Sequence, residues 1–332
     1  SLSFSSPIMQ APWPESTLYP SRTAGYRNFA TNFWNASLFA QMNGVKHDPD
    51  FKPEKAKLAL NRWILTELSK TVVAVTTGIE NYKFNESASA LYRFIWNTLC
   101  DWYLELLKPI FQGFNEDAKN EVQACTAWVL DEVYKLLHPF MPHMTEELWS
   151  LTETLGMKRE DMLALIQWPE ASFSDEEAAS DINWLIDAVS AIRSVRFEMN
   201  IPAAALAPLV IVEGGELTLK RVKLYESLLK KLARVETISF SDKAPALSAQ
   251  MILGEAIFCL PLGQLIDLEA ERARLMKDVS KIEQDIEKLS AKLSNPKFIE
   301  NAKPEIVEVE RNRIVELRTA QKKISLALER LV

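Results

Sequence analysis

Apolar residues in the C-terminal part of the chain recur at alternating spacings of three and four, in two runs. They are Leu268, Leu275, Val279, Ile282, Ile286, Leu289 and Leu293 in the first run, and Val307, Ile314, Leu317, Ile324, Leu328 and Leu331 in the second. The first run breaks at Ser294, Asn295 and Pro296, and the second begins after Pro304. This pattern predicts a long antiparallel helical hairpin whose two apolar stripes close on each other. A first helix of about 26 residues would extend roughly 40 Å. We therefore expect an arm that contacts something distant.

Helical periodicity also dominates residues 21–175, where proline and glycine separate the segments. The expected helices are 26–42, 55–81, 87–107, 116–137 and 145–155. Their short connections favour a bundle of about five helices. Before them, residues 1–20 hold four prolines, spaced so that neither a helix nor a paired strand can pass through. We expect residues 1–20 to be a linker or a truncated edge.

The pattern changes after residue 175. A helix at 181–198 precedes an apolar run at 206–212, and a basic amphipathic helix at 217–233 precedes three strand-like runs at 237–240, 249–253 and 256–260. Gly254 and Glu255 join the last two runs and suggest a tight hairpin. The expected fold class is thus mainly α, with a helical bundle at 21–175, a small α/β unit at 176–264 and a helical hairpin, or coiled coil, at 265–332.

Composition is that of an ordinary soluble globular protein, with 332 residues, of which 48% are hydrophobic and 25% charged. No apolar run approaches the length of a membrane span, and the first residues lack the layout of a signal peptide. We expect a cytoplasmic protein. The three cysteines, Cys100, Cys125 and Cys259, form no CxxC pair, so the sequence suggests neither a disulfide framework nor a zinc cluster.

Charge is distributed unevenly along the chain. Residues 265–332 carry 14 Lys and Arg against 13 Asp and Glu, whereas the whole chain has a formal net charge of −7. The remainder therefore carries −8. Most arm charges are expected to be solvated flanks of a coiled coil, but a row of cations on a rigid helix also suits a phosphate backbone.

A catalytic site has little support in the sequence. Glycine is scarce and no GxxxxGK[ST] or GxGxxG loop occurs. The two prolines between His138 and His143 forbid the helical spacing of a zinc pair, so this segment is expected to be a turn in which Pro142 opens a helix. No nucleophile has a recognisable partner motif. We therefore predict no catalytic residue, no metal and no cofactor in this chain.

Three segments resemble the anticodon-binding helical domain of class I aminoacyl-tRNA synthetases. They are Gly25–Ser37, the stretch from Phe84 to Glu105, and His138–Trp149. Within the arm, Asp267–Leu275 and Leu293–Phe298, followed by Ala302, Pro304 and Val307, resemble the C-terminal coiled coil of the valyl-tRNA synthetases. The resemblance covers about residues 22–332.

The resemblance implies that the bundle binds the anticodon stem-loop of valine tRNA and that the arm binds the tRNA elbow. The implied anticodon contacts are Arg27, Asn32, Asn35, Lys83, Phe84 and Asn85. The implied elbow contacts are Arg272, Lys277, Lys281, Arg311, Arg318 and Lys322. In the family, ATP and magnesium serve a catalytic domain with HIGH and KMSKS motifs, and a further domain edits. Those motifs are absent here, so we expect a monomeric tRNA-recognition portion that is inactive without the catalytic and editing domains.

Three alternatives remain at this point. The arm could be a protein-interaction coiled coil of an adaptor, which would form a concentration-dependent dimer. The chain could instead be a free-standing RNA-binding paralogue. A complete enzyme of unknown type is the third alternative, and the absence of any nucleophile, metal or phosphate motif argues against it.

Overall fold

The computed structural model describes residues 20–155, 159, 161–263, 265, 268–294 and 304–329. Its contacts divide the chain into two compact units, of which the first ends at Trp184 and the second begins at Leu185, inside helix α7 (Glu176–Glu198). Of the expected linker at 1–20, residues 1–19 lie outside the described residues, as does the expected turn at Asn295 and Pro296, whereas Pro20 is the first residue of a helix. The three-part division of the chain at 175 and 264 stays a prediction.

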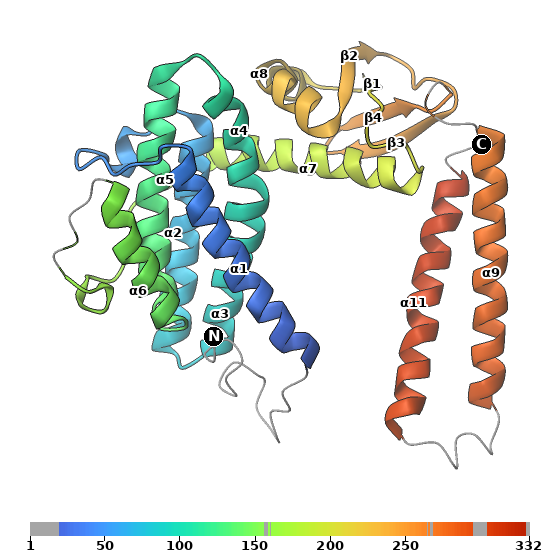
Figure 1. The fold of residues 1–332 in the computed structure, drawn as a ribbon. Helices are drawn as coiled ribbons and strands as arrows, with labels where there is room; N and C mark the ends of the chain where they lie inside the picture. Colours follow the sequence, from blue (N-terminus) through green and yellow to red (C-terminus); the bar gives the residue numbers. More distant parts are fainter. Residues whose placement is uncertain are drawn as a thin grey trace. The chain divides into compact units, whose positions relative to one another are not determined.

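The first unit is a helical bundle, as predicted (Figure 1). Its main helices are α1 (Pro20–Met42), α2 (Ala59–Glu80), α3 (Phe84–Arg93), α4 (Leu104–Gln112), α5 (Glu116–Leu137) and α6 (Pro142–Leu151). Short 3-10 turns, Pro53–Lys55, Thr152–Leu155 and Leu163–Leu165, connect or extend them. Pro142 opens α6 at its first position, as the sequence predicted, because a helix start needs no N–H there.

Two buried tyrosines fix how the helices of this unit pack. The Tyr103 hydroxyl donates to Asn61 Oδ1 on α2 at 3.0 Å and lies 3.2 Å from Thr126 Oγ1 on α5. The Tyr134 hydroxyl on α5 donates to Ser37 Oγ on α1 at 3.0 Å. Both side chains are fully buried, so each hydroxyl needs a partner inside the core. These bonds tie α1 and α2 to α5.

The predicted helix 87–107 differs from the structure, and the helices predicted at 26–42 and 181–198 begin earlier, at Pro20 and Glu176. The helix predicted at 87–107 begins earlier, at Phe84, and continues through a π-helical stretch, Phe94–Tyr103, into α4. It passes Pro109, which the pattern suggested would end it. Proline removes one backbone donor, and here it lies in the last turns of α4, close to the C-cap at Gly113.

The second unit contains a four-stranded sheet in the order β2-β1-β4-β3. The strands are β1 (Ala207–Val212), β2 (Val235–Ser241), β3 (Ser248–Leu253) and β4 (Ala256–Pro261). Strands β1 and β2 are parallel and are connected by α8 (Glu216–Ala233), whereas β4 is antiparallel to both β1 and β3. The β3–β4 hairpin turns at Gly254, whose φ of 61° suits glycine, and this confirms the predicted hairpin.

The C-terminal hairpin consists of α9 (Leu268–Ser294) and α11 (Pro304–Glu329), which run antiparallel to each other (Figure 1). Leu275 is buried, and most of the other described apolar positions of the predicted stripes are half-buried. Lys292 and Glu283 on α9 reach across to Glu310 and Gln321 on α11 at 2.6 and 3.0 Å. The predicted helical hairpin is therefore confirmed, and with it the mainly α fold class. No helix in the described part of the chain combines the length and apolar character that a membrane span requires.

Candidate nucleic-acid interface

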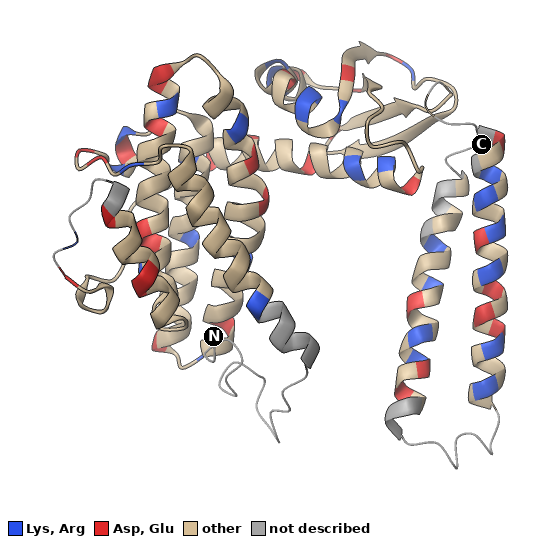
Figure 2. Cartoon of the chain, in the orientation of Figure 1, with Lys and Arg blue, Asp and Glu red and all other residues tan. Residues whose placement is uncertain are grey.

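Helix α1 presents an exposed face that carries no acidic residue. Its buried face consists of Phe29, Phe33, Ala36, Ser37 and Ala40. The predicted contact residues Arg27, Asn32 and Asn35 are exposed. The whole of α1, Pro20–Met42, contains neither Asp nor Glu, and Figure 2 shows no acidic colour along it. In a chain of net charge −7, such an amide-rich and acid-free face suits contact with a polyanion.

The second predicted group lies at the turn between α2 and α3. Lys83 is the N-cap residue of α3, Phe84 is its first residue and half-buried, and Asn85 is exposed. Lys83 forms an exposed ion pair with Glu86 at 3.1 Å, which is worth little in water. Lys83 and Asn85 line a groove between α2 and α3 that Arg93 also lines. The structure thus brings two of these three residues to a surface hollow.

A cluster of stacked rings connects α1 to the helical segment that follows Asn85. The Phe29 ring stacks on Tyr92 with centroids 5.0 Å apart, and Tyr92 stacks on Trp96 at 5.8 Å. Phe29 is two residues from Arg27, and Tyr92 is two helical turns beyond Asn85. The start of α1 and the α2–α3 turn accordingly lie at the same end of the first unit (Figure 1).

Many lysines and arginines lie along both helices of the arm (Figure 2). Arg272, Lys277, Lys281, Arg311, Arg318 and Lys322, the six predicted contacts, are all exposed. Within the described part of the chain, none of these six takes part in an ion pair. By contrast, Arg274 pairs with Asp278 at 2.8 Å and Lys292 pairs with Glu310 at 2.6 Å. Among the described residues, the six predicted cations are therefore without an ion-pair partner.

Helix geometry sorts these cations into stripes. At about 100° per residue, one stripe of α9 occupies an arc of roughly 60°. Its members are Arg274, Lys277, Lys281, Lys288 and Lys292. A stripe of α11 holds Arg311, Arg318 and Lys322 within roughly 40°. Arg272 lies about 140° around the helix from Lys277, so it does not share the face of Lys277 and Lys281.

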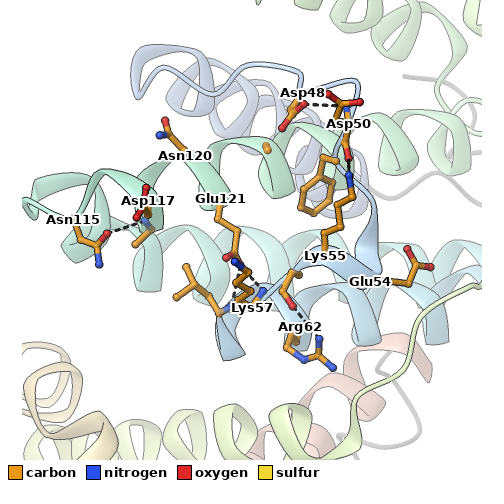
Figure 3. Close-up of a pocket in the computed structure, with 15 residues that line it drawn as sticks. Asp48, Asp50, Glu54, Lys55, Lys57, Arg62, Asn115, Asp117, Asn120 and Glu121 are labelled. Atoms are coloured by element: carbon orange, nitrogen blue, oxygen red, sulfur yellow. Dashed lines mark hydrogen bonds between the residues drawn. The ribbon is translucent and has the colours of Figure 1, made fainter.

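A larger groove in the first unit contains a carboxylate, Glu121, that has a structural role. It is lined by residues before and within the start of α2 and at the start of α5 (Figure 3). Glu121 points into it and accepts hydrogen bonds from the backbone N–H groups of Lys57 and Leu58 at 2.9 and 2.8 Å, and from Asn61 Nδ2 at 2.9 Å. A carboxylate at this position satisfies the first donors of α2. Acidic lining residues, which include Asp48, Asp50 and Glu54, make this groove unsuited to a phosphate backbone.

Burial holds two of the described cysteine thiols in their protonated form. Burial raises the pKa of the Cys100 thiol to about 12, and burial also raises the pKa of Cys125. Both thiols therefore stay protonated and unreactive near neutral pH. His138 Nδ1 lies 2.9 Å from Thr145 Oγ1, which places this histidine in the turn before α6. Among the described residues, no cluster of His, Cys, Asp and Glu could hold a metal ion.

Sequence reasoning missed Tyr82 as a candidate residue of this surface. Its side chain is 82% exposed, next to Lys83, and its backbone φ is 57°. Periodicity carries no information about φ. The available clue was the position of an aromatic residue where a helix C-terminus ordinarily has glycine.

Comparison with known families identifies two parts of the chain. Residues 61–211 match the anticodon-binding domain of tRNA ligases, and residues 267–332 match the valyl tRNA synthetase tRNA binding arm. The first match includes Lys83, Phe84 and Asn85, whereas α1 precedes it. The second match includes all six predicted arm cations.

Relatives extend the similarity to the whole chain. The valine–tRNA ligase of Bartonella henselae is 94% identical over 332 residues, which are 100% of this chain and 37% of that protein. The corresponding ligase of Brucella suis is 58% identical over 330 residues, which are 99% of this chain and 36% of that protein. That of Caulobacter vibrioides is 47% identical over 316 residues, 95% of this chain and 35% of that protein. The chain thus spans little more than a third of the length of these relatives. With the matches to the anticodon-binding domain and the arm, this similarity shows that the chain belongs to the valine–tRNA ligase family.

Proposed function

We propose that this chain is the tRNA-recognition portion of a valine–tRNA ligase, which binds the anticodon stem-loop with its bundle and the tRNA elbow with its arm. The observation that carries the proposal is the pair of family matches, one to an anticodon-binding domain and one to a tRNA-binding arm, in one chain. The surfaces described above support it physically.

The exposed face of α1 supports the role of the bundle. An anticodon loop presents unpaired bases that protein side chains can bind on their edges, and amide side chains both donate and accept hydrogen bonds. Asn32 and Asn35, about 60° apart around the helix, supply such amides, and Arg27 supplies a cation about 80° from Asn35. The proposed partners at the neighbouring turn are Lys83, Phe84 and Asn85.

The cation stripes support the role of the arm. Lys277 and Lys281 on α9, like Arg311 and Arg318 on α11, would contact phosphates and release counterions on binding. A helix of 27 residues spans roughly 40 Å, a length suited to the outer corner of a folded tRNA. We include Arg272 and Lys322 among the proposed contacts.

The two remote contacts serve the chemical step indirectly. Binding free energy from remote parts of a substrate can position its reacting end and lower the barrier of the reaction. In this proposal the reacting end of valine tRNA is presented to catalytic and editing domains outside this chain, where ATP and magnesium act. We propose that the chain itself contributes tRNA binding, that the catalytic residues and cofactor sites belong to those domains, and that the chain is inactive in aminoacylation without them.

The packing of the hairpin also concerns the oligomeric state of the chain. Its apolar seam closes between α9 and α11 of one chain, with Leu275 only 2% exposed. The other described seam positions are half-buried against the facing helix of the same chain, which leaves them only partly accessible to a second copy. We therefore propose a monomer and place the adaptor alternative second.

Binding of the purified chain to valine tRNA and to a non-cognate tRNA, each at two salt concentrations, tests the proposal. The expected result is preferential binding of valine tRNA that weakens as salt increases. Equal binding of both tRNAs would indicate nonspecific electrostatic attraction without recognition of valine tRNA. Absence of binding, together with a concentration-dependent dimer, would favour the coiled-coil adaptor.

A further inference from the structure

The turn between α2 and α3 holds an aromatic residue in a conformation that costs free energy. Tyr82 has a φ of 57°, in the left-handed region. Its N–H donates to Ile79 O at 3.0 Å, and the N–H of Lys83 donates to Gly78 O at 2.7 Å. These bonds close the C-terminus of α2, at a position where glycine is preferred because a β-carbon is strained there. A tyrosine at this position therefore requires a compensating role.

The Tyr82 ring makes few contacts within the protein. The side chain is 82% exposed, and its ring contact is an edge-on approach to Phe84 with centroids 6.3 Å apart. Among the described residues, the Tyr82 hydroxyl has no hydrogen-bond partner. Of the five non-glycine residues with positive φ in the described structure, Tyr82 is the only aromatic one. Packing within the protein does not account for it.

The groove beside Tyr82 has the chemistry of a single-stranded RNA site. Both chain neighbours of Tyr82, Asn81 and Lys83, line it. Thr77, Asn85 and Ser89 add hydroxyl and amide groups, and Arg93 adds a cation that has no ion pair in the described structure. Glu86, the acid in this lining, is paired with Lys83 at 3.1 Å. Hydrogen-bonding groups, a free cation and an exposed ring thus lie together.

We propose that the Tyr82 ring is a stacking platform for one unpaired base of a bound RNA, with the Arg93 guanidinium on a phosphate of the same strand. Exposed aromatic rings bind bases because every base has a π-face, and an adjacent cation favours the backbone. The inference rests on the proposed function and adds two residues, Tyr82 and Arg93, to the predicted anticodon contacts. It also adds the exposed ring of Tyr82 to the half-buried ring of Phe84.

Replacing Tyr82 separates a stacking role from a structural one, because glycine relieves the backbone strain while it removes the ring. The experiment compares the wild-type chain with Tyr82→Gly, Tyr82→Phe and, as a matched control, Phe114→Ala at another exposed aromatic. The probes are the anticodon stem-loop of valine tRNA and the same stem without its unpaired loop. Affinity at several salt concentrations and the temperature of thermal unfolding are measured.

We expect Tyr82→Gly to weaken stem-loop binding by roughly tenfold and to leave its salt dependence unchanged, because no charge is removed. The unfolding temperature should be unchanged or higher. Tyr82→Phe and Phe114→Ala should bind as the wild type does, and the stem without its loop should not distinguish the variants.

Wild-type affinity of Tyr82→Gly would overturn the inference and leave the proposed function standing. A lower unfolding temperature of Tyr82→Gly would show that the ring packs within the fold, and an equal loss in Tyr82→Phe would assign the effect to the hydroxyl. Either result overturns the stacking role. Failure of the wild-type chain to bind the stem-loop counts instead against the proposed function, before any variant is compared.

Discussion

Ser87 on α3 occupies the space that a β-carbon on Gly78 of α2 would need. A β-carbon built on Gly78 overlaps Ser87 Oγ and lies 3.2 Å from the Ser87 backbone nitrogen and 3.3 Å from Lys83 O. The Ser87 hydroxyl is itself held by donation to Val75 O at 3.0 Å. The close approach of α2 and α3, which forms one wall of the proposed RNA site, therefore depends on the absence of a side chain at residue 78.

Gly78→Ala should destabilise the first unit. Neither the fixed Ser87 hydroxyl nor the backbone atoms can move away without opening the turn, and such overpacking costs about 1–3 kcal/mol. Urea unfolding followed by tryptophan fluorescence measures the change. Gly263→Ala is the control, because a β-carbon there meets no atom within 4 Å. Equal stability of Gly78→Ala and the wild type would show that the turn adapts freely.

The fold was largely predictable because its signals are local. Helix α5 runs from Glu116 to Leu137 as predicted, since Asn115 caps its start and accepts from Ala118 N at 3.0 Å. The π-helical stretch Phe94–Tyr103 was not predictable, because one extra residue in a turn barely changes the apolar period. Passage of the helix through Pro109 was missed because proline usually ends a helix, whereas here it lies in the last turns of α4.

The residue types of the candidate interface could be predicted from the sequence, but their arrangement in space could not. The spacing of Lys and Arg along the arm predicted exposed stripes. Only the observed ion pairs distinguish Arg274, which is paired, from Lys277 and Lys281, which have no ion pair in the described structure. Arg272 was predicted together with Lys277, although five residues along a helix correspond to a rotation of about 140°. Tyr82 was missed because its unusual property is a backbone angle.

Replacing Lys277 and Lys281 by glutamine should weaken binding of valine tRNA and flatten its salt dependence. Removal of one cation from a phosphate lowers the slope of log K against log salt by about 0.9 or somewhat less, so the slope of the double variant should fall by roughly 1.5–2. Affinity measured across a salt series gives the slope.

Arg274→Gln is the matched control on the same stripe, because Asp278 already pairs with Arg274 at 2.8 Å. It should change the slope less than either single lysine variant. An unchanged slope in the Lys277 and Lys281 double variant would remove this stripe from the proposed elbow contact.

Asp175 should make the stability of the first unit depend on pH in the acid range. Its carboxylate accepts from Ala178 N at 3.0 Å at the start of α7 and pairs with Arg62 on α2, and these interactions lower its pKa below 3.8. Because the folded pKa is the lower one, the stabilisation is fully present above pH 3.8 and is lost as pH falls through the folded value.

Asp175→Asn keeps an N-cap acceptor but removes the charge. The free energy of unfolding, measured by urea titration from neutral to acid pH, should differ between wild type and variant most at neutral pH and converge at the acid end. Glu80→Gln, at an exposed acid of the same unit, should run parallel to the wild type. A constant difference between wild type and Asp175→Asn at all pH values would contradict the charge-based explanation.

Arg196 should be essential to the second unit, because its buried guanidinium organises three backbone carbonyls. The side chain is 6% exposed at the end of α7 and donates to Ala205 O at 2.7 Å, Pro202 O at 3.1 Å and Arg234 O at 3.4 Å. Burial, and next the charge of Arg234, lower its pKa. The bonds join the connection before β1 to the junction of α8 and β2.

Arg196→Met preserves much of the volume but leaves these carbonyls without their donor, so we expect a loss of about 2–4 kcal/mol in the unfolding of the second unit. Arg196→Lys should recover little, since an ammonium cannot reproduce the planar fork that reaches several carbonyls at once. Hydrogen exchange of the β1 and β2 amides measures the effect locally, with Lys223→Met on the exposed side of α8 as the control. If those amides remain protected from exchange in Arg196→Met, the sheet rather than the arginine holds the connection in place.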